Sequence, residues 1–590
     1  MPLLSLLEKS RERSKLHMIS GITLKLTILT SITLAVATGA HAADRPPNRI
    51  DQEIDFDKKL RQQEQINQEL EKNRRGYTSP QKPTPTTPET SSDTGPKFPI
   101  KKITIDTGSE SALAVDVSDI LSNYENREIG NVELFALIRD VTNRYAENGY
   151  STTTISLIPK NLKDGTVALL VNWGKVEGWL INGKKPSTLQ EQLMTISAMP
   201  GVTDKPLNIH QVDQMVENLN TSAKTARVDI QPSERVGYSF LNLIIEEQKE
   251  PTLTLRANNS GMGSPSEGRY RFSASTSISD LLLGNDTLSI NLNARRYQMD
   301  KSNSEYSGGL NYSVPFGYSK LDLRLNHSQY EKLSTGRYGD YDTSGNSQIY
   351  AAKLSRVLTR EKTQKLTAFV ELEHKNNSNF IEDTLISINS IPYTKFAFGL
   401  EHVTQLLGGS LYSDITLSKG LSILDSEKSA FSKNGNKRHF RKVEFNTAWS
   451  HPFTLASKEF NFSSRLGGQY SAENMLSAEK LGLGDEFTVR GFKGPPLWGD
   501  QAVYLSNTVT MPMKLLGGTV SPLLGLDTGY AHDVAPNKDK GAITGLAIGT
   551  SANWSHGGGS ITLGVPLHIN EALKEQSEGT ILYLSTYLTF

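Results

Sequence analysis

Short runs in which apolar and polar residues alternate fill the chain from Pro251 to Phe590, and helical spacing is absent there. Between Asp286 and Ala294, for example, aliphatic side chains share one face of an extended chain, and serine and asparagine share the other. The runs recur about every 20 residues, whereas strands of a soluble sandwich usually recur every 8 to 12. This spacing favours a transmembrane antiparallel β-barrel over residues 250–590, of about 16 strands, the even number that bacterial barrels require.

A closed barrel is also the form in which the residues after 43 could cross a membrane. They contain no stretch that approaches the ~20 consecutive apolar residues of a transmembrane helix, and the mean hydropathy is negative. Unpaired backbone groups are too costly in hydrocarbon for an open sheet to span it. If the mature protein meets a membrane, we expect closed strands.

Residues 1–42 have the pattern of a secretory signal peptide. Basic residues precede an apolar run from Leu26 to Val36, and the run is followed by Ala40-His41-Ala42, a small-residue cleavage pattern. The run is shorter than the ~20 residues that span a bilayer. We therefore predict cleavage after Ala42, with an uncleaved anchor as the alternative.

Two segments of opposite character follow. Residues 51–75 are rich in Glu, Gln, Lys, Arg and Leu without Gly or Pro, which favours a helix that is polar nearly all round. Such a helix lies in water or in a polar cavity, and a solvated or frayed linker helix is the alternative. Residues 76–97 repeat Pro, Ser and Thr, which predicts an extended tether.

Residues 98–249 change to a mixed pattern of helix and strand. Helical spacing over 132–147 lies between strand-like runs, and a similar β-α-α-β-β order begins again at Val176. The pattern predicts two small α+β modules in tandem, a first module at 98–174 and a second module at 175–249.

Composition excludes several classes of function. Acidic and basic residues balance at 63 each, so no global basic field favours a nucleic-acid partner. The chain has no cysteine, which removes disulfides, thiolate nucleophiles and cysteine-bound metals. The usual nucleotide, zinc-protease and serine-hydrolase motifs are absent, so we expect neither enzyme activity nor a cofactor or metal.

The stretch from Gly149 to Gly183 links the two modules to a known family. It resembles the first POTRA domain, and its junction with the second, in two-partner secretion transporters, which export filamentous haemagglutinins and haemolysins. The matching positions are Gly149, Tyr150, Thr152, Thr153, Gly165, Gly174, Val176 and Glu177. Pro159-Lys160-Asn161-Leu162 and Pro232-Ser233 depart from the family pattern, at positions without a chemical role.

The segment FTVRGFKG at 487–494 resembles the V-R-G-(F/Y) tip of the long sixth loop in this family and in the related assembly insertases. The motif residues here are Val489, Arg490, Gly491 and Phe492. An arginine whose loop folds into the barrel needs a partner, because a desolvated unpaired guanidinium is expensive.

Asp527 is the partner that the sequence offers. In Leu523 to Ala531 one face is apolar, and the other carries this single carboxylate among small residues that include Gly529. The family likewise places an aspartate in a D-x-G motif at the corresponding strand. We predict a charge-assisted, bidentate Arg490–Asp527 lock; a solvated Arg490 and an ordinary lumenal Asp527 are the alternative.

The end of the chain carries a further signal. Strand-like alternation ends on Phe590, and the set Tyr583, Leu588 and Phe590 resembles the terminal signal that the bacterial barrel-assembly machinery reads.

The resemblance implies a function and its partners. The protein would sit in the bacterial outer membrane, in contact with lipid, with both POTRA domains in the periplasm. It would move one large unfolded exoprotein, an adhesin, a haemolysin or a contact-dependent toxin, to the cell surface without nucleotide, while helix 51–75 plugs the resting pore. An assembly insertase is the main alternative; a diffusion porin and a barrel enzyme explain less of the chain.

Overall fold

The computed structural model describes residues 48–75, 96–159, 164–248, 252–260, 268–282, 284–296, 303–336, 339–361, 363–386, 390–424, 438–493, 497–534, 540–569 and 579–590. The predicted signal peptide lies outside the described residues, as does nearly all of the predicted tether at 76–97.

The first module packs two helices on a small mixed sheet. In the sheet the order is β2-β5-β4, with β2 and β5 parallel, and a separate pair joins β1 to β3. The predicted strand from Phe98 to Ile105 is therefore two strands, because its first half pairs with β3 and its second with β5. The elements are β1 Phe98–Ile100, β2 Lys102–Asp106, η1 Gly108–Leu113, α3 Ser118–Ser122, β3 Arg127–Ile129, α4 Asn131–Glu147, β4 Thr154–Leu157 and β5 Thr166–Asn172.

The second module repeats this arrangement. Its sheet has the order β6-β8-β7, with β6 and β8 parallel and β7 antiparallel to β8. The first helix, α5, begins with a capping box in which Glu191 accepts hydrogen bonds from the backbone N–H groups of Thr188 and Ser187, and these hold the pKa of Glu191 at about 2. The elements are β6 Lys175–Ile181, α5 Leu189–Ala198, α6 Ile209–Leu219, β7 Lys224–Pro232 and β8 Tyr238–Glu247.

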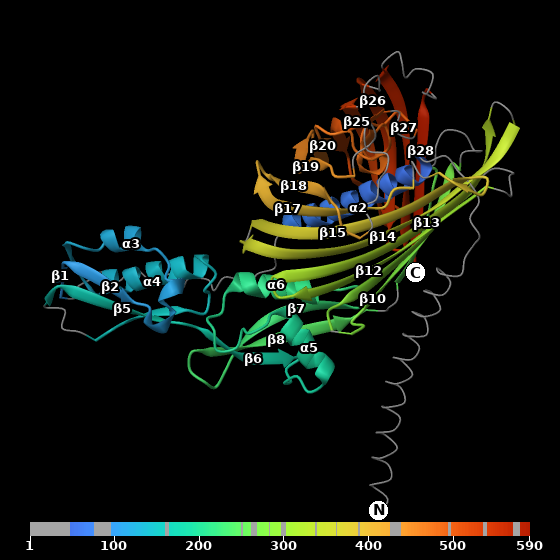
Figure 1. Cartoon of the computed structure of the whole chain (residues 1–590). Coiled ribbons are helices and arrows are strands. Elements are labelled where there is room, and N and C mark those ends of the chain that lie inside the picture. Colours follow the sequence, from blue (N-terminus) through green and yellow to red (C-terminus); the bar gives the residue numbers. More distant parts are fainter. Residues whose placement is uncertain are drawn as a thin grey trace, which may run out of the picture.

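The remainder of the described chain is a closed antiparallel barrel of sixteen long strands, as the spacing predicted (Figure 1). Two short strands, β16 Thr384–Leu385 and β24 Met513–Leu515, extend it at its rims, and β28 closes the circle against β9. The long strands are β9 Thr252–Asn258, β10 Tyr270–Ser279, β11 Thr287–Arg296, β12 Ser304–Phe316, β13 Ser319–Gly336, β14 Gly339–Arg360, β15 Gln364–Ile381, β17 Tyr393–Leu406, β18 Gly409–Leu421, β19 Arg441–Leu455, β20 Lys458–Tyr470, β23 Gln501–Thr510, β25 Gly518–His532, β26 Lys540–Trp554, β27 Gly557–Ile569 and β28 Ile581–Thr589.

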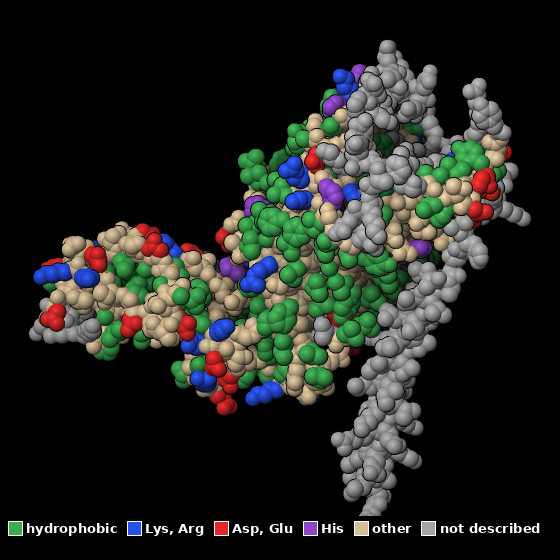
Figure 2. Space-filling view, viewed as in Figure 1, with side chains coloured by type: hydrophobic (Ala, Val, Ile, Leu, Met, Phe, Trp, Pro, Cys, Tyr) green, Lys and Arg blue, Asp and Glu red, His purple; other side chains and the backbone are tan. Residues whose placement is uncertain are grey.

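Alternation along the strands gives the barrel an apolar outer face and a polar lumen. On β25, Leu524 and Leu526 are more than half exposed on the outer face. The next residue, Asp527, points to the lumen and is fully buried. Hydrophobic side chains cover much of the outer face (Figure 2). This is the pattern of a barrel that spans lipid. In the described part of the chain, no helix combines the length and the apolar character needed to cross a bilayer.

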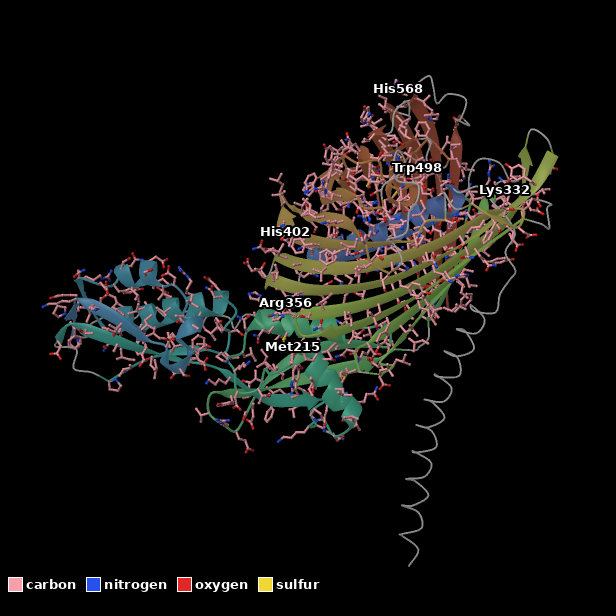
Figure 3. The ribbon with its side chains drawn as sticks, viewed as in Figure 1. Met215, Lys332, Arg356, His402, Trp498 and His568 are labelled. Carbon is pink, nitrogen blue, oxygen red and sulfur yellow. The ribbon has the colours of Figure 1, made fainter. Side chains whose placement is uncertain are left out.

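The second module is bound to one rim of the barrel. Asn218 on α6 donates to the carbonyl oxygen of Gly317 in the β12–β13 turn (2.7 Å), and the Gly317 N–H donates to the carbonyl oxygen of Ser197 (2.9 Å). Arg356 and His402 lie at this end of the barrel, and Lys332 and His568 lie towards the other (Figure 3). The short turn between β12 and β13 therefore faces the second module.

Candidate functional site

The long connection between β20 and β23, residues 471–500 and here called loop 6, folds back into the barrel. It contains η4 Ser477–Glu479 and a two-stranded sheet of β21 Leu481–Leu483 and β22 Leu497–Gly499. Its apolar side chains form a buried cluster with residues of the barrel wall: Leu483, Val489, Phe492, Leu497, Ala502, Tyr504, Ala531 and Ile543. This cluster fixes the loop tip, which carries Arg490, against the lumenal wall.

The structure brings the predicted pair Arg490 and Asp527 together. The guanidinium donates from Nε to Oδ2 (2.6 Å) and from Nη2 to Oδ1 (2.7 Å), and the Arg490 backbone N–H also donates to Oδ2 (3.0 Å). Asp527 is fully buried, and the Arg490 side chain is 12% exposed. Ser506 donates to Oδ1 (2.8 Å), and Thr508 accepts from Nη2 (2.9 Å). A bidentate, mostly buried pair with Ser506 and Thr508 as further partners holds the loop tip in one position.

Glycines on three adjacent strands make room for this tip. A β-carbon on Gly545 of β26 would overlap the carbonyl oxygen of Arg490, and one on Gly564 of β27 would lie 2.6 Å from the Gly491 nitrogen. On β25, Gly525 lies against the Arg490 guanidinium, and a β-carbon on the predicted site residue Gly529 would lie 3.0 Å from Val489. Gly545 and Gly564 were not among the predicted site residues. Glycine inside a strand marks close backbone approach, and this signal could have found them.

Replacing Gly545 with alanine is expected to displace the loop tip, because the methyl group has no space. Overpacking of this kind costs about 1–3 kcal/mol. Greater protease cleavage within loop 6 of the purified variant would report the displacement. Gly178→Ala is the matched control, because its β-carbon would meet only a Phe240 ring carbon at 4.0 Å. A Gly545→Ala protein with the cleavage pattern of the unaltered chain would contradict the prediction.

Tyr583 belongs to this site and not to the exposed end of the chain. Its hydroxyl accepts from the N–H groups of Gly491 (3.0 Å) and Phe492 (3.1 Å) and donates to the carbonyl oxygen of Phe492 (2.5 Å). Leu588 and Phe590 are exposed on the other face of β28. The predicted assembly signal thus grouped residues from two faces, because alternation places odd and even positions of a strand on opposite sides.

A second anchor holds the base of loop 6 to another part of the wall, at β17 and β19. Glu479 in η4 is buried among cations, with Lys395 of β17 at 2.9 Å and Lys442 of β19 at 2.6 Å. The Tyr393 hydroxyl also donates to Glu479 (2.7 Å). A lone glutamate in a polar loop gives no signal in the sequence, because its partners come from strands about 40 to 85 residues earlier in the chain.

Helix α2, Asn48–Arg75, lies inside the barrel (Figure 1). Lys59 is 7% exposed and bridges Asp485 of loop 6 (2.7 Å) and its own neighbour Asp55 (2.6 Å). The ring of Phe56 packs edge-on against Phe487, with 5.0 Å between centroids. The N-terminal half of the helix therefore contacts loop 6 directly, a few residues from Arg490.

The rest of α2 contacts the barrel wall and the second module. Its two buried apolar residues, Ile66 and Leu70, pack on Val403, Tyr412 and Ala448. Further along, Glu69 pairs with Lys365 of β15 (2.7 Å), and Lys72 lies 3.4 Å from Glu217 of α6. These contacts explain how so polar a helix is held: charges on the lumenal wall match charges on the helix. Beside the helix a cavity of about 790 Å³ remains, lined largely by polar side chains.

The described residues contain no group of three or more His, Asp or Glu side chains that could hold a metal ion. The site consists of a loop, a helix and a polar-lined cavity.

Comparison with known proteins agrees with this architecture. Residues 98–174 match the POTRA domain of ShlB type, and residues 175–232 match a POTRA domain. The chain is 26% identical over 521 residues to the outer membrane transporter CdiB of Escherichia coli, which covers 86% of each chain. It is 27% identical over 445 residues to the hemolysin transporter protein HpmB of Proteus mirabilis, covering 74% of this chain and 76% of that one.

The fold is also that of a solved relative. CdiB from Escherichia coli superposes with a TM-score of 0.80 at 24% identity, over 91% of this chain and 98% of that chain. Residues 237–552, more than half of the chain, match the model of the haemolysin secretion/activation proteins ShlB/FhaC/HecB. The chain therefore belongs to the haemolysin secretion/activation protein family, ShlB/FhaC/HecB, as the resemblance in residues 149–183 and 487–494 predicted.

Proposed function

We propose that this protein is the outer-membrane transporter of a two-partner secretion system and exports one large exoprotein from the periplasm to the cell surface. The observation that carries the proposal is the combination in one chain of a polar-lined barrel, two POTRA modules, the second bound to its rim, and a polar helix inside it. A diffusion porin needs neither the modules nor the helix. The curated relatives named as transporters support the same class.

Cargo enters from the periplasmic side as an unfolded chain. The modules offer sheet edges, such as β4 in the first module and β7 in the second, to which an extended segment could add by backbone hydrogen bonds. A polar lumen then offers the unfolded chain hydrogen-bond partners along its path. Folding at the cell surface draws transport forward without nucleotide and without catalysis by the transporter.

The resting lumen is closed by α2, and transport requires that the helix leave. Its contacts are mainly ion pairs, and its apolar contacts are confined to the Ile66–Leu70 cluster and the Phe56–Phe487 pair, so little apolar surface is exposed on release. The entering cargo and water must replace the ion-pair partners that the helix leaves behind. The chain before the first module supplies the tether. The Arg490–Asp527 lock remains in place and keeps loop 6 against the wall while the helix moves.

Biogenesis adds two further partners to the proposal. Lipid surrounds the apolar outer face of the barrel. The barrel-assembly machinery reads the terminal strand, where Leu588 and Phe590 stay exposed on the outer face.

Co-expression tests the function directly. We expect a neighbouring gene for a very large, repeat-rich exoprotein, and we expect that exoprotein in the medium only when this transporter is present. Purified transporter in liposomes should take up the unfolded cargo without added nucleotide. An assembly insertase would instead leave the exoprotein unaffected and lower the amounts of other barrels in the outer membrane, which are scored in the same cells.

A further inference from the structure

Helix α5 of the second module carries a strip of apolar side chains that no other described part of the chain covers. Leu189 is 72% exposed and Ile196 is 50% exposed, and Leu193 between them is partly exposed. Successive residues of a helix turn by about 100°, so these three positions share one side. Met194 and Ala198, on the opposite side, are buried in the core of the module. We refer to Leu189, Leu193 and Ile196 as the α5 strip.

The rim of the barrel contacts a third side of α5. Asn285, in the turn between β10 and β11, donates to the carbonyl oxygen of Met194 (2.7 Å) and to the Ser197 hydroxyl (2.6 Å). The next turn contacts the C-terminal end of the helix, where Gly317 donates to the Ser197 carbonyl oxygen (2.9 Å). Helix α5 thus runs along the rim, directly beneath strands β10 to β13, with its strip turned away from the core of its own module.

The outer face of these strands is apolar down to the same rim. Leu282 in the β10–β11 turn is 63% exposed, and Phe316, which precedes Gly317, is 53% exposed. In Figures 1 and 2, α5 lies next to the ends of these strands, and hydrophobic side chains gather over both on the same face. The strip therefore continues the lipid-facing surface of the barrel.

The level of the lipid headgroups can be placed from the same strands. Arg356 on β14 is exposed on the outer face between Leu354 and Leu358, which are each 51% exposed. Its register partner is Ser319, two residues after Gly317. An arginine among outward leucines at the end of a strand keeps its stem in the apolar layer and its guanidinium among phosphates. Helix α5 contacts the rim at this level.

We propose that the α5 strip inserts into the periplasmic leaflet of the outer membrane, at the boundary between phospholipid headgroups and acyl chains. A helix that lies along this boundary buries an apolar side in lipid and keeps its other sides in contact with protein and water. Together with the bonds to the barrel turns, this contact fixes the second module against the membrane plane. The inference requires only that the barrel lies in a bilayer, and it does not depend on secretion of a cargo.

Spin labels can test the proposal, and the absence of cysteine from the chain makes the labelling specific. Single variants Leu189→Cys and Ile196→Cys of the mature full-length protein are labelled with a nitroxide in phospholipid nanodiscs. Collision of each label with oxygen, which concentrates in hydrocarbon, is compared with collision with a water-soluble nickel chelate. Phe316→Cys on the outer face provides the lipid reference. Phe135→Cys, on α4 of the first module and 70% exposed, provides the matched reference for water.

We expect oxygen to dominate at positions 189 and 196, as at 316, and nickel to dominate at 135. Nickel dominance at both strip positions would overturn the proposal. Labels at 189 and 196 that neither reagent reaches would overturn it as well, because protein would then cover the strip. All four positions are exposed, so the variants keep the core intact, and the heat-dependent gel mobility of the folded barrel verifies this for each.

Discussion

Replacement of Arg490 with alanine is expected to abolish export of the partner protein while the barrel still assembles. The change removes both arms of the bidentate pair and leaves Asp527 fully buried without its cation. Breaking a buried pair in this way costs about 3–5 kcal/mol, which is enough to shift loop 6 from its docked position in most molecules. The measurement is the amount of cargo in the medium, set against the amount of heat-modifiable transporter in the outer membrane.

Three further variants separate the lock from a general need for charge. Arg441→Ala removes an arginine that is 79% exposed and is expected to secrete normally. Arg490→Lys keeps the charge but cannot form the parallel pair of hydrogen bonds, so it should restore little. The exchange Arg490→Asp with Asp527→Arg should restore part of the export. Normal secretion by Arg490→Ala alone would refute the lock.

Deletion of residues 48–75 is expected to increase the ion conductance of the purified protein in planar bilayers severalfold. The helix occupies the lumen along most of its length, from the contact of Phe56 with Phe487 to the pair of Glu69 with Lys365. Without it the polar wall encloses an open aqueous path. Single-channel recording gives the measurement, and Gln68→Ala, a change at an exposed position of the helix, serves as the matched control.

The converse experiment holds the helix in place. Ile66 and Ala448 belong to one buried cluster. The chain contains no cysteine, so two introduced cysteines have no native thiol to react with. The double variant Ile66→Cys with Ala448→Cys, once joined by a short bifunctional methanethiosulfonate cross-linker, should keep conductance low and stop secretion, and a reductant that cleaves the cross-link should restore both. A chain without residues 48–75 that conducts like the complete protein would show that the helix does not close the pore.

Much of this architecture could be predicted from local patterns. Alternation gave the barrel and its strand number, and helical spacing gave α4 of the first module, because both patterns record which side of an element is buried. The Arg490–Asp527 pair could be predicted because the resemblance of residues 487–494 identified the loop-tip arginine, and Asp527 is the single carboxylate on the small-residue face of its strand. In each case the pattern that allowed the prediction lies within one strand, one helix or one loop.

The parts that could not be predicted depend on residues far apart in the chain. Glu479 acquires its cations from β17 and β19, and Lys59 acquires its partner from a loop more than 400 residues later. The sequence of a polar segment does not show which of its charged residues will pair with charges from distant strands. The contact of Tyr583 with the loop tip was not predicted for a related reason, since the sequence alone does not show what approaches the inner face of β28.

The glycines of the barrel wall that contact the tip of loop 6 also limit which substitutions the protein can accept. Gly545 and Gly564 carry no functional group, yet the backbone of Arg490 and Gly491 occupies the place of their missing side chains. Every substitution of glycine adds at least one carbon atom, so any codon change that alters the amino acid at either position creates an overlap. We therefore expect these two glycines to remain unchanged in evolution, whichever cargo the transporter exports.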